Sequence, residues 1–112
     1  MREIITLNRN KEFTKAYSKG KSFVSPVLVI YVIKNRAKNI RIGITASKKI
    51  GNAVERNRAK RVIKESFRKI SPLLSGNFDL VFVARKKTCE VKSTKILQIM
   101  EQNLKKAGLL EE

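Results

Sequence analysis

An α+β fold is the class that the sequence predicts, with helices packed on a sheet of about four strands in a two-layer sandwich. Two patterns indicate it. Stretches rich in β-branched apolar residues are typical of strands, and segments with apolar residues three or four positions apart are typical of amphipathic helices. The chain has 112 residues, of which 42% are hydrophobic. This is the usual size of one domain, so we expect a single domain over residues 1–112.

The first half of the chain predicts one helix and three strands. The helix covers residues 8–20, where Phe13 and Tyr17 share a face and Gly20 ends it. Three strands follow, near residues 22–24, at 25–33 and at 40–47. Alternation in the third strand points its isoleucines inward and turns outward Arg41, Gly43 and Thr45.

The second half predicts two helices around one more strand. A long helix should run from about Asn52 to Ile70, with Pro72 just beyond its end. Residues 78–85, FDLVFVAR, predict a buried strand, and a last helix should begin near Ser93. The expected order of elements is therefore α-β-β-β-α-β-α.

The charge of the chain points to a polyanionic partner. Lys and Arg number 26 against 9 Asp and Glu, which gives a net charge of +17. RNA or DNA is the first candidate, which would make this an RNA-binding domain, and an anionic membrane surface is the second. There is no His, Cys89 is the single cysteine, and we find no apolar run long enough to span a membrane and no signal peptide. These features favour a soluble protein in the reducing cytoplasm.

The helix from residue 52 to 70 carries most of this signal. Its inward stripe is apolar, and the opposite side lines up Asn57, Arg61, Lys64 and Arg68, flanked by Lys60 and Arg58. Arg56 falls nearer the inward stripe, which suggests a structural role. A solvated face usually mixes charges of both signs, yet only Glu55 and Glu65 oppose these cations. A surface that binds phosphates is therefore favoured over a merely solvated one.

Residues 47–68, SKKIGNAVERNRAKRVIKESFR, resemble the signature of the protein subunit of bacterial ribonuclease P. That family's hallmark RNR corresponds to Arg56, Asn57 and Arg58. The similarity extends over nearly the whole chain, through an early aromatic helix, the sequence GKSF, a strand carrying Tyr31 and the sequence VFVARK.

The resemblance implies a function without catalytic residues in this chain. In that family an RNA subunit cleaves the 5′ leader from precursor tRNA using Mg²⁺, and the protein supports it as part of an endoribonuclease. It implies no metal or organic cofactor held by the protein, no membrane and no obligate protein partner. Contacts to the catalytic RNA are implied for Lys48, Lys49, Asn52, Arg56, Asn57, Arg58, Lys60, Arg61, Lys64 and Arg68.

The resemblance also implies a cleft for the single-stranded leader, at the aromatic positions Phe13, Tyr17 and Tyr31. Taken alone, Phe13 and Tyr17 at this helical spacing are more often core residues than a stacking surface, and Tyr31 is ambiguous. The four lysines Lys11, Lys15, Lys19 and Lys21 lie near the helix aromatics in sequence, which favours a single-strand groove. The family further implies a left-handed β-α-β crossover, although general rules predict a right-handed one.

Two other functions stay open from the residues alone. A ribosomal or generic basic RNA-binding protein would account for the charge, but not for the RNR arrangement. A stand-alone nuclease would need clustered carboxylates to hold metal ions, or a His for metal-free chemistry. The nine acids form no such pair within the predicted fold, and there is no His.

Overall fold

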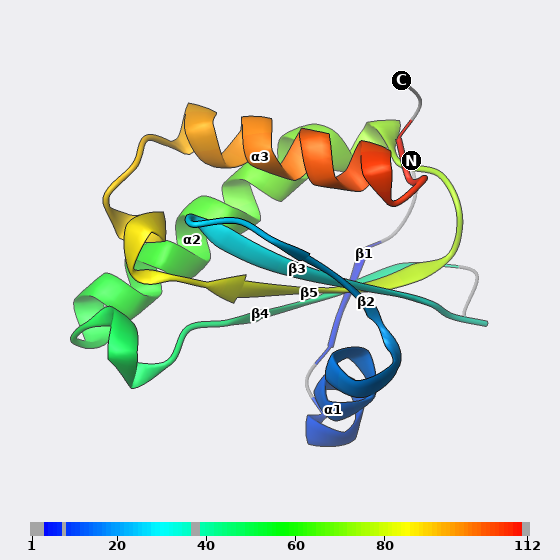
Figure 1. Ribbon diagram of the computed structural model, residues 1–112, viewed down its shortest axis with the longest axis horizontal. Helices are drawn as coiled ribbons and strands as arrows, with labels where there is room; N and C mark the ends of the chain where they lie inside the picture. Colours follow the sequence, from blue (N-terminus) through cyan, green and yellow to red (C-terminus); the bar gives the residue numbers. More distant parts are fainter. Residues whose placement is uncertain (1–3, 8, 37–38, 111–112) are drawn as a thin grey trace.

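A five-stranded mixed sheet forms the centre of the structure, a computed structural model that describes residues 4–7, 9–36 and 39–110. Three α-helices pack on it (Figure 1). The elements follow in the order β1 (Ile4–Thr6), α1 (Asn10–Lys19), β2 (Lys21–Val24), β3 (Leu28–Lys34), β4 (Ile40–Thr45), the 3-10 helix η1 (Lys48–Ile50), α2 (Ala53–Ile70), η2 (Ser71–Leu73), β5 (Phe78–Ala84), η3 (Lys86–Cys89) and α3 (Ser93–Lys106).

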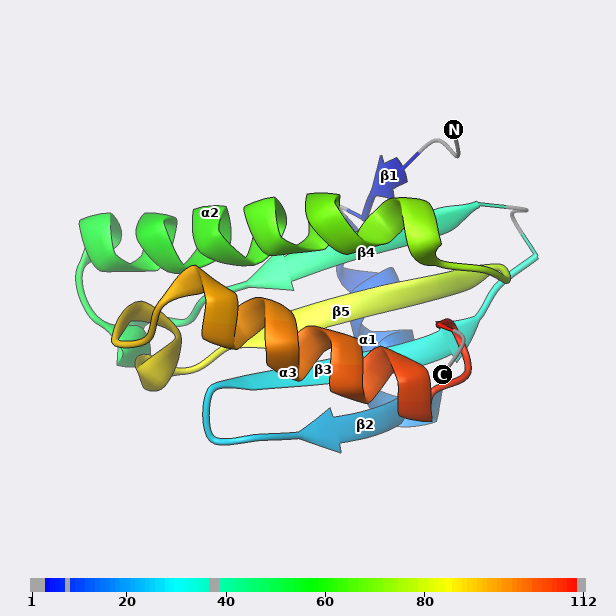
Figure 2. The same ribbon diagram turned by 90° about the horizontal axis from the view of Figure 1, so that it is seen from above.

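The strands lie in the order β1-β4-β5-β3-β2. β4 pairs in parallel with both β1 and β5, whereas β3 pairs antiparallel with β5 and with β2. Two parallel neighbours, β4 and β5, are thus joined through α2. Seen from the α2 side in Figure 2, this connection has the left-handed sense that the family resemblance implied.

The helices occupy both faces of the sheet. α2 and α3 cover one face, and α1 lies against the other (Figure 1). The α+β class and the predicted order of helices and strands are confirmed, with two differences from the expected arrangement. One is α1 on the opposite face, outside a strict two-layer sandwich. The other is β1, whose three residues are too few to show the alternation by which a strand is recognised.

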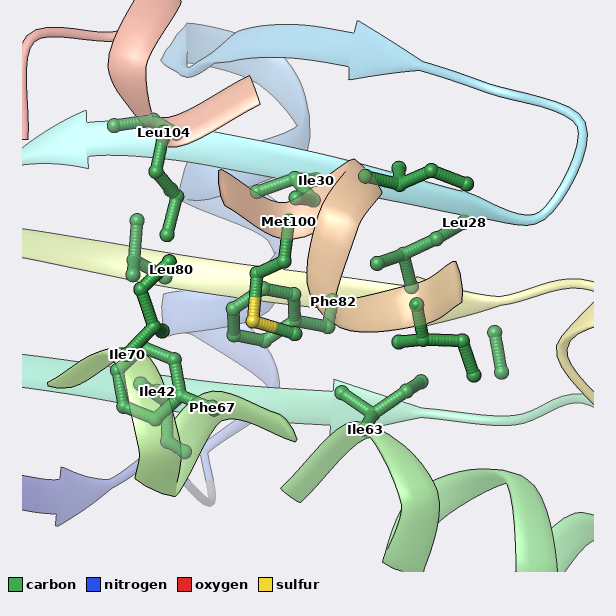
Figure 3. Close-up of a cluster of buried hydrophobic side chains, with 14 of the residues drawn as sticks. Leu28, Ile30, Ile42, Ile63, Phe67, Ile70, Leu80, Phe82, Met100 and Leu104 are labelled. Carbon is green, nitrogen blue, oxygen red and sulfur yellow. The ribbon is translucent and has the colours of Figure 1, made fainter. Parts of the chain in front are cut away.

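The main core lies between the sheet and the helices α2 and α3 (Figure 3). Phe82 of β5 and Phe67 of α2 meet at its centre, with ring centroids 5.5 Å apart. Strand alternation supplies the sheet side, because Leu28 and Ile30 are fully buried while Tyr31 faces α1. The predicted inward stripe of α2 is confirmed, since its buried residues are Ala59, Ile63, Ser66, Phe67 and Ile70.

A second, smaller cluster lies under α1. Its buried members are Leu7, Ala16 and Val81, and partly buried Phe13 and Tyr31 pack against it. Because this cluster is small, α1 is attached to the sheet by few apolar contacts, and the aromatic residues at its border remain partly accessible.

Candidate RNA interface

The start of α2 is built by a reciprocal cap. The Asn52 side chain accepts a hydrogen bond from the Glu55 N–H at 2.9 Å, and the Glu55 carboxylate accepts one from the Asn52 N–H at 3.2 Å. Gly51 enters this turn with φ +151°, and a Cβ there would collide with the Glu55 carboxylate. The Glu55 carboxylate is thereby engaged in the cap, and it forms no ion pair with the arginines that follow it.

Removing the Asn52 cap should lower the stability of the protein. Asn52 is also one of the residues for which the resemblance implies RNA contact. Asn52→Ala should lower the free energy of unfolding by about 1 kcal/mol, because the Glu55 N–H loses its acceptor. Asn52→Ser can still cap and should stay close to the wild type in urea denaturation. If Asn52→Ala and the wild type unfold with the same urea midpoint, the side chain of Asn52 does not stabilise the helix as a cap.

The cations of α2 form an exposed strip along its flank. We call Asn57, Lys60, Arg61, Lys64 and Arg68 the basic stripe, and all five are exposed. Arg58 is exposed as well, and Arg56 is half-buried, in agreement with its predicted position near the inward stripe. In the described part of the chain the ion pairs all involve Arg41, so no described acid forms an ion pair with the stripe. This arrangement leaves the cations available to phosphates.

The residues before α2 add to this surface and bring in cations that sequence reasoning missed. Lys48 and Lys49 are exposed in η1. Lys49 shares a pocket of about 550 Å³ with Arg85, Lys86 and Lys87, which follow β5. The sequence contained the signal for this group, because parallel strands end at the same edge of a sheet and both β4 and β5 lead into Lys-rich turns.

The predicted cleft residues lie together on the α1 side of the sheet. Tyr17 and Tyr31 meet edge to face with ring centroids 4.9 Å apart, and Phe13 lies 6.5 Å from Tyr17. Tyr17 is 43% exposed, whereas Phe13 and Tyr31 are partly buried. The three rings therefore form one partly accessible aromatic surface. We call it the aromatic cleft after the leader cleft that the resemblance implies, which stays a prediction.

Gly43 explains how Phe13 reaches this position. A Cβ on Gly43 would lie 2.6 Å from two atoms of the Phe13 ring, so only glycine lets the ring rest on β4. Of the lysines expected near the cleft, Lys11, Lys15 and Lys19 are exposed on α1. Lys21 points elsewhere, because its ammonium lies 5.6 Å from the centre of the Phe23 ring, which packs against the main core.

An ion-pair network below the aromatic cleft ties α1 to the sheet. The Arg41 guanidinium binds the Asp79 carboxylate through two hydrogen bonds of 2.7 Å, and its third contact reaches Glu12 of α1 at 3.1 Å. Asn35 also donates to Asp79, at 2.7 Å. The hydrogen-bonded Asp79 raises the pKa of Arg41, so the guanidinium remains charged throughout the neutral range. Asp79 and Glu12, which are both distant from Arg41 in sequence, thus have structural roles.

Three further observations bear on the expected chemistry. Among the described residues, no group of three or more His, Cys, Asp or Glu lies close enough together to hold a metal ion. No helix in that part of the chain is sufficiently long and apolar to cross a membrane. Cys89 packs against the main core and donates from its thiol to the Glu55 carbonyl at 3.3 Å, and burial raises its pKa.

Comparison with known protein families and sequences gives one consistent result. The family model described as Ribonuclease P matches residues 1–108. A ribonuclease P protein component of Clostridium kluyveri is 42% identical over 109 residues, which cover 96% of this chain and 97% of that protein. One from Caldanaerobacter subterraneus subsp. tengcongensis is 42% identical over 113 residues, covering 100% of this chain and 97% of the relative.

Solved structures agree with the sequence matches. The RNase P protein of Staphylococcus aureus superposes with a TM-score of 0.84 at 31% identity, covering 97% of this chain and 100% of the other. The RNase P protein of Thermotoga maritima gives a TM-score of 0.80 at 30% identity, with coverages of 90% and 96%. The similarity therefore extends over the whole fold.

Proposed function

The chain belongs to the ribonuclease P protein family, and from this membership we propose that α2 and the aromatic cleft hold two different RNAs. As a ribonuclease P protein component, it is part of the enzyme that processes tRNA, and an RNA partner is implied by the family. In our proposal the catalytic RNA lies along the basic stripe, and the single-stranded 5′ leader of precursor tRNA enters the aromatic cleft.

The single observation that carries the first part is the basic stripe of α2, whose cations form no ion pair with a described acid. Its cations are spaced one helical turn apart, so they can follow a phosphodiester backbone. Arg61 and Arg68 can each bind a phosphate bidentately, and Lys60 and Lys64 add point charges. Lys48, Lys49 and Asn52 extend the proposed surface toward the start of the helix, where Arg56 lies half-buried.

The second part rests on the aromatic cleft. Stacking on aromatic rings tolerates any base sequence, which suits a leader that differs from one tRNA to the next. The exposed lysines of α1 would attract its phosphates. Arg41 holds α1 through Glu12 at the position where Phe13 and Tyr17 face Tyr31.

In the same proposal the protein does no chemistry of its own. The Mg²⁺ that the reaction uses would be held by the RNA subunit, and the described residues of this chain would bind and orient RNA. The one domain would act within this ribonucleoprotein in the cytoplasm, where a lone cysteine such as Cys89 stays reduced.

The salt dependence of binding tests the role of α2. Arg61→Ala and Lys64→Ala should each lower the slope of log K against log salt by about 0.7 to 0.9 for the catalytic RNA, because one phosphate contact and its released counterions are lost. The measurement is the dissociation constant of the protein–RNA complex over a salt series, with thermal melting of each variant alongside.

Lys106→Ala is the matched control, since it removes one exposed charge at the end of α3. It should leave the slope nearly unchanged. If Lys106→Ala lowers the slope as much as Arg61→Ala does, the RNA responds to the total charge of +17 rather than to the stripe, and the assignment to α2 is wrong.

A further inference from the structure

A groove lies between the outer flank of α2 and the β1–β4 edge of the sheet. Two adjoining hollows of about 360 and 230 Å³ form it, and both are lined by Thr6, Ile42 and Lys64. The larger hollow is within the size range of small-molecule sites. We call the two hollows together the edge groove. Figure 2 shows α2 running along β4, with β1 beyond it.

The two sides of the edge groove differ in chemistry. Its helix side carries four cations of the basic stripe, Lys60, Arg61, Lys64 and Arg68, and no described acid lines either hollow. Its sheet side is mainly apolar, because the buried Ile42 and the partly exposed Ile44 of β4 line the larger hollow. A ligand that fits both sides must combine negative charge with an apolar surface.

The sheet edge also offers backbone hydrogen bonds. The β1–β4 register ends at the pair Thr6 and Ile42, where the Leu7 N–H donates to the Ile42 carbonyl at 2.6 Å. Backbone groups of alternate residues in a strand face the same edge, so the N–H and C=O of Ile44 point outward beyond the end of β1. β4 ends at Thr45 and no described residue pairs with Ile44 on this side, so the open edge is one residue long.

We propose that the edge groove binds one unpaired nucleobase of the RNA that lies along α2. The phosphates would rest on the basic stripe, the ring on the partly exposed Ile44 side chain, and the base edge on the Ile44 backbone. This rests on the proposed function, because the stripe must hold RNA for a base to reach the groove. An RNA duplex does not fit, because its bases stay stacked inside the helix. A peptide strand does not fit either, because an edge of one residue is too short to pair with it.

Filling the groove tests this without removing a charge. Thr6 is exposed and lines both hollows, so Thr6→Trp should occupy the space of the base. We expect the catalytic RNA to bind about tenfold more weakly, because a base contact is lost. The salt slope should stay unchanged, because every phosphate contact is kept. Thr6→Ser, which leaves the groove open, should bind as the wild type does.

Chemical probing of the RNA locates the contact. Acylation of ribose 2′-hydroxyls should show at least one unpaired nucleotide that wild-type protein protects and Thr6→Trp leaves reactive, while the other protections persist. Thr6→Gln intrudes less and should act in the same direction more weakly, which keeps the test usable if Thr6→Trp lowers the melting temperature.

The outcomes separate this inference from the function on which it rests. If Thr6→Trp and Thr6→Gln bind as tightly as the wild type with the same protections, the nucleobase site is wrong, even where Arg61→Ala lowers the salt slope as expected. If Arg61→Ala and Lys64→Ala leave that slope unchanged, the RNA does not lie on the stripe, and both proposals fail together.

Discussion

Replacing Arg41 with methionine should lower the free energy of unfolding by roughly 3 kcal/mol, because it leaves a nearly buried carboxylate without its charged partner. The Asp79 side chain is only 7% exposed, and among the described residues the side-chain donor left to it would be Asn35. The Arg41 side chain keeps 27% of its surface, so solvent offsets part of the loss. Equilibrium urea denaturation of the variant and the wild type measures the difference.

Two other substitutions isolate the cause. Arg41→Lys keeps the charge but loses the two-pronged contact with Asp79, so its stability should fall between those of the wild type and Arg41→Met. Arg61→Met removes an exposed arginine from α2 and should change the free energy of unfolding by no more than about 0.5 kcal/mol. Equal losses for Arg41→Met and Arg61→Met would mean that the network contributes nothing specific to the fold.

The sequence predicted the elements whose periodicity is long and uninterrupted. In α2, eighteen residues repeat the helical pattern, so the buried positions of Ile63 and Phe67 and the half-buried Arg56 could all be placed in advance. In β3 and β5, seven-residue strands separate the two faces of the sheet. Burial follows directly from such patterns, because every turn of helix or pair of strand residues reports on the same face.

Features that depend on contacts between distant segments were not predictable. The alternation of its strand predicts only that Arg41 points outward. Nothing near Arg41 in sequence shows that Asp79 and Glu12 are its partners. Lys21 follows α1 closely, yet strand pairing turns it toward Phe23 and away from the aromatic cleft. The edge groove depends on β1, whose three residues carry no periodicity of their own.

The aromatic cleft leads to the second large expected effect. Tyr17→Ala should remove most of one base-stacking interaction, worth about 1–3 kcal/mol, from the binding of precursor tRNA by the assembled ribonucleoprotein. Tyr17 is the sharpest probe of the three rings because it is the most exposed. Phe13→Ala and Tyr31→Ala should weaken the same preference, but both also remove packing from the cluster around Ala16 and Val81. Mature tRNA, which lacks a leader, should bind each variant as it binds the wild type.

The measurement is the ratio of affinities for precursor and mature tRNA across a salt series. Stacking does not involve phosphate charge, so Tyr17→Ala should lower the ratio at a nearly constant salt slope, and Tyr17→Phe, which keeps the ring, should preserve it. Gly43→Ala gives an independent route, because its methyl group must displace the Phe13 ring and should lower the ratio without removing any aromatic residue. Full leader preference in both Tyr17→Ala and Gly43→Ala would show that these rings only pack α1 on the sheet. The assignment of α2 would survive that result, since it depends on different residues on the opposite face.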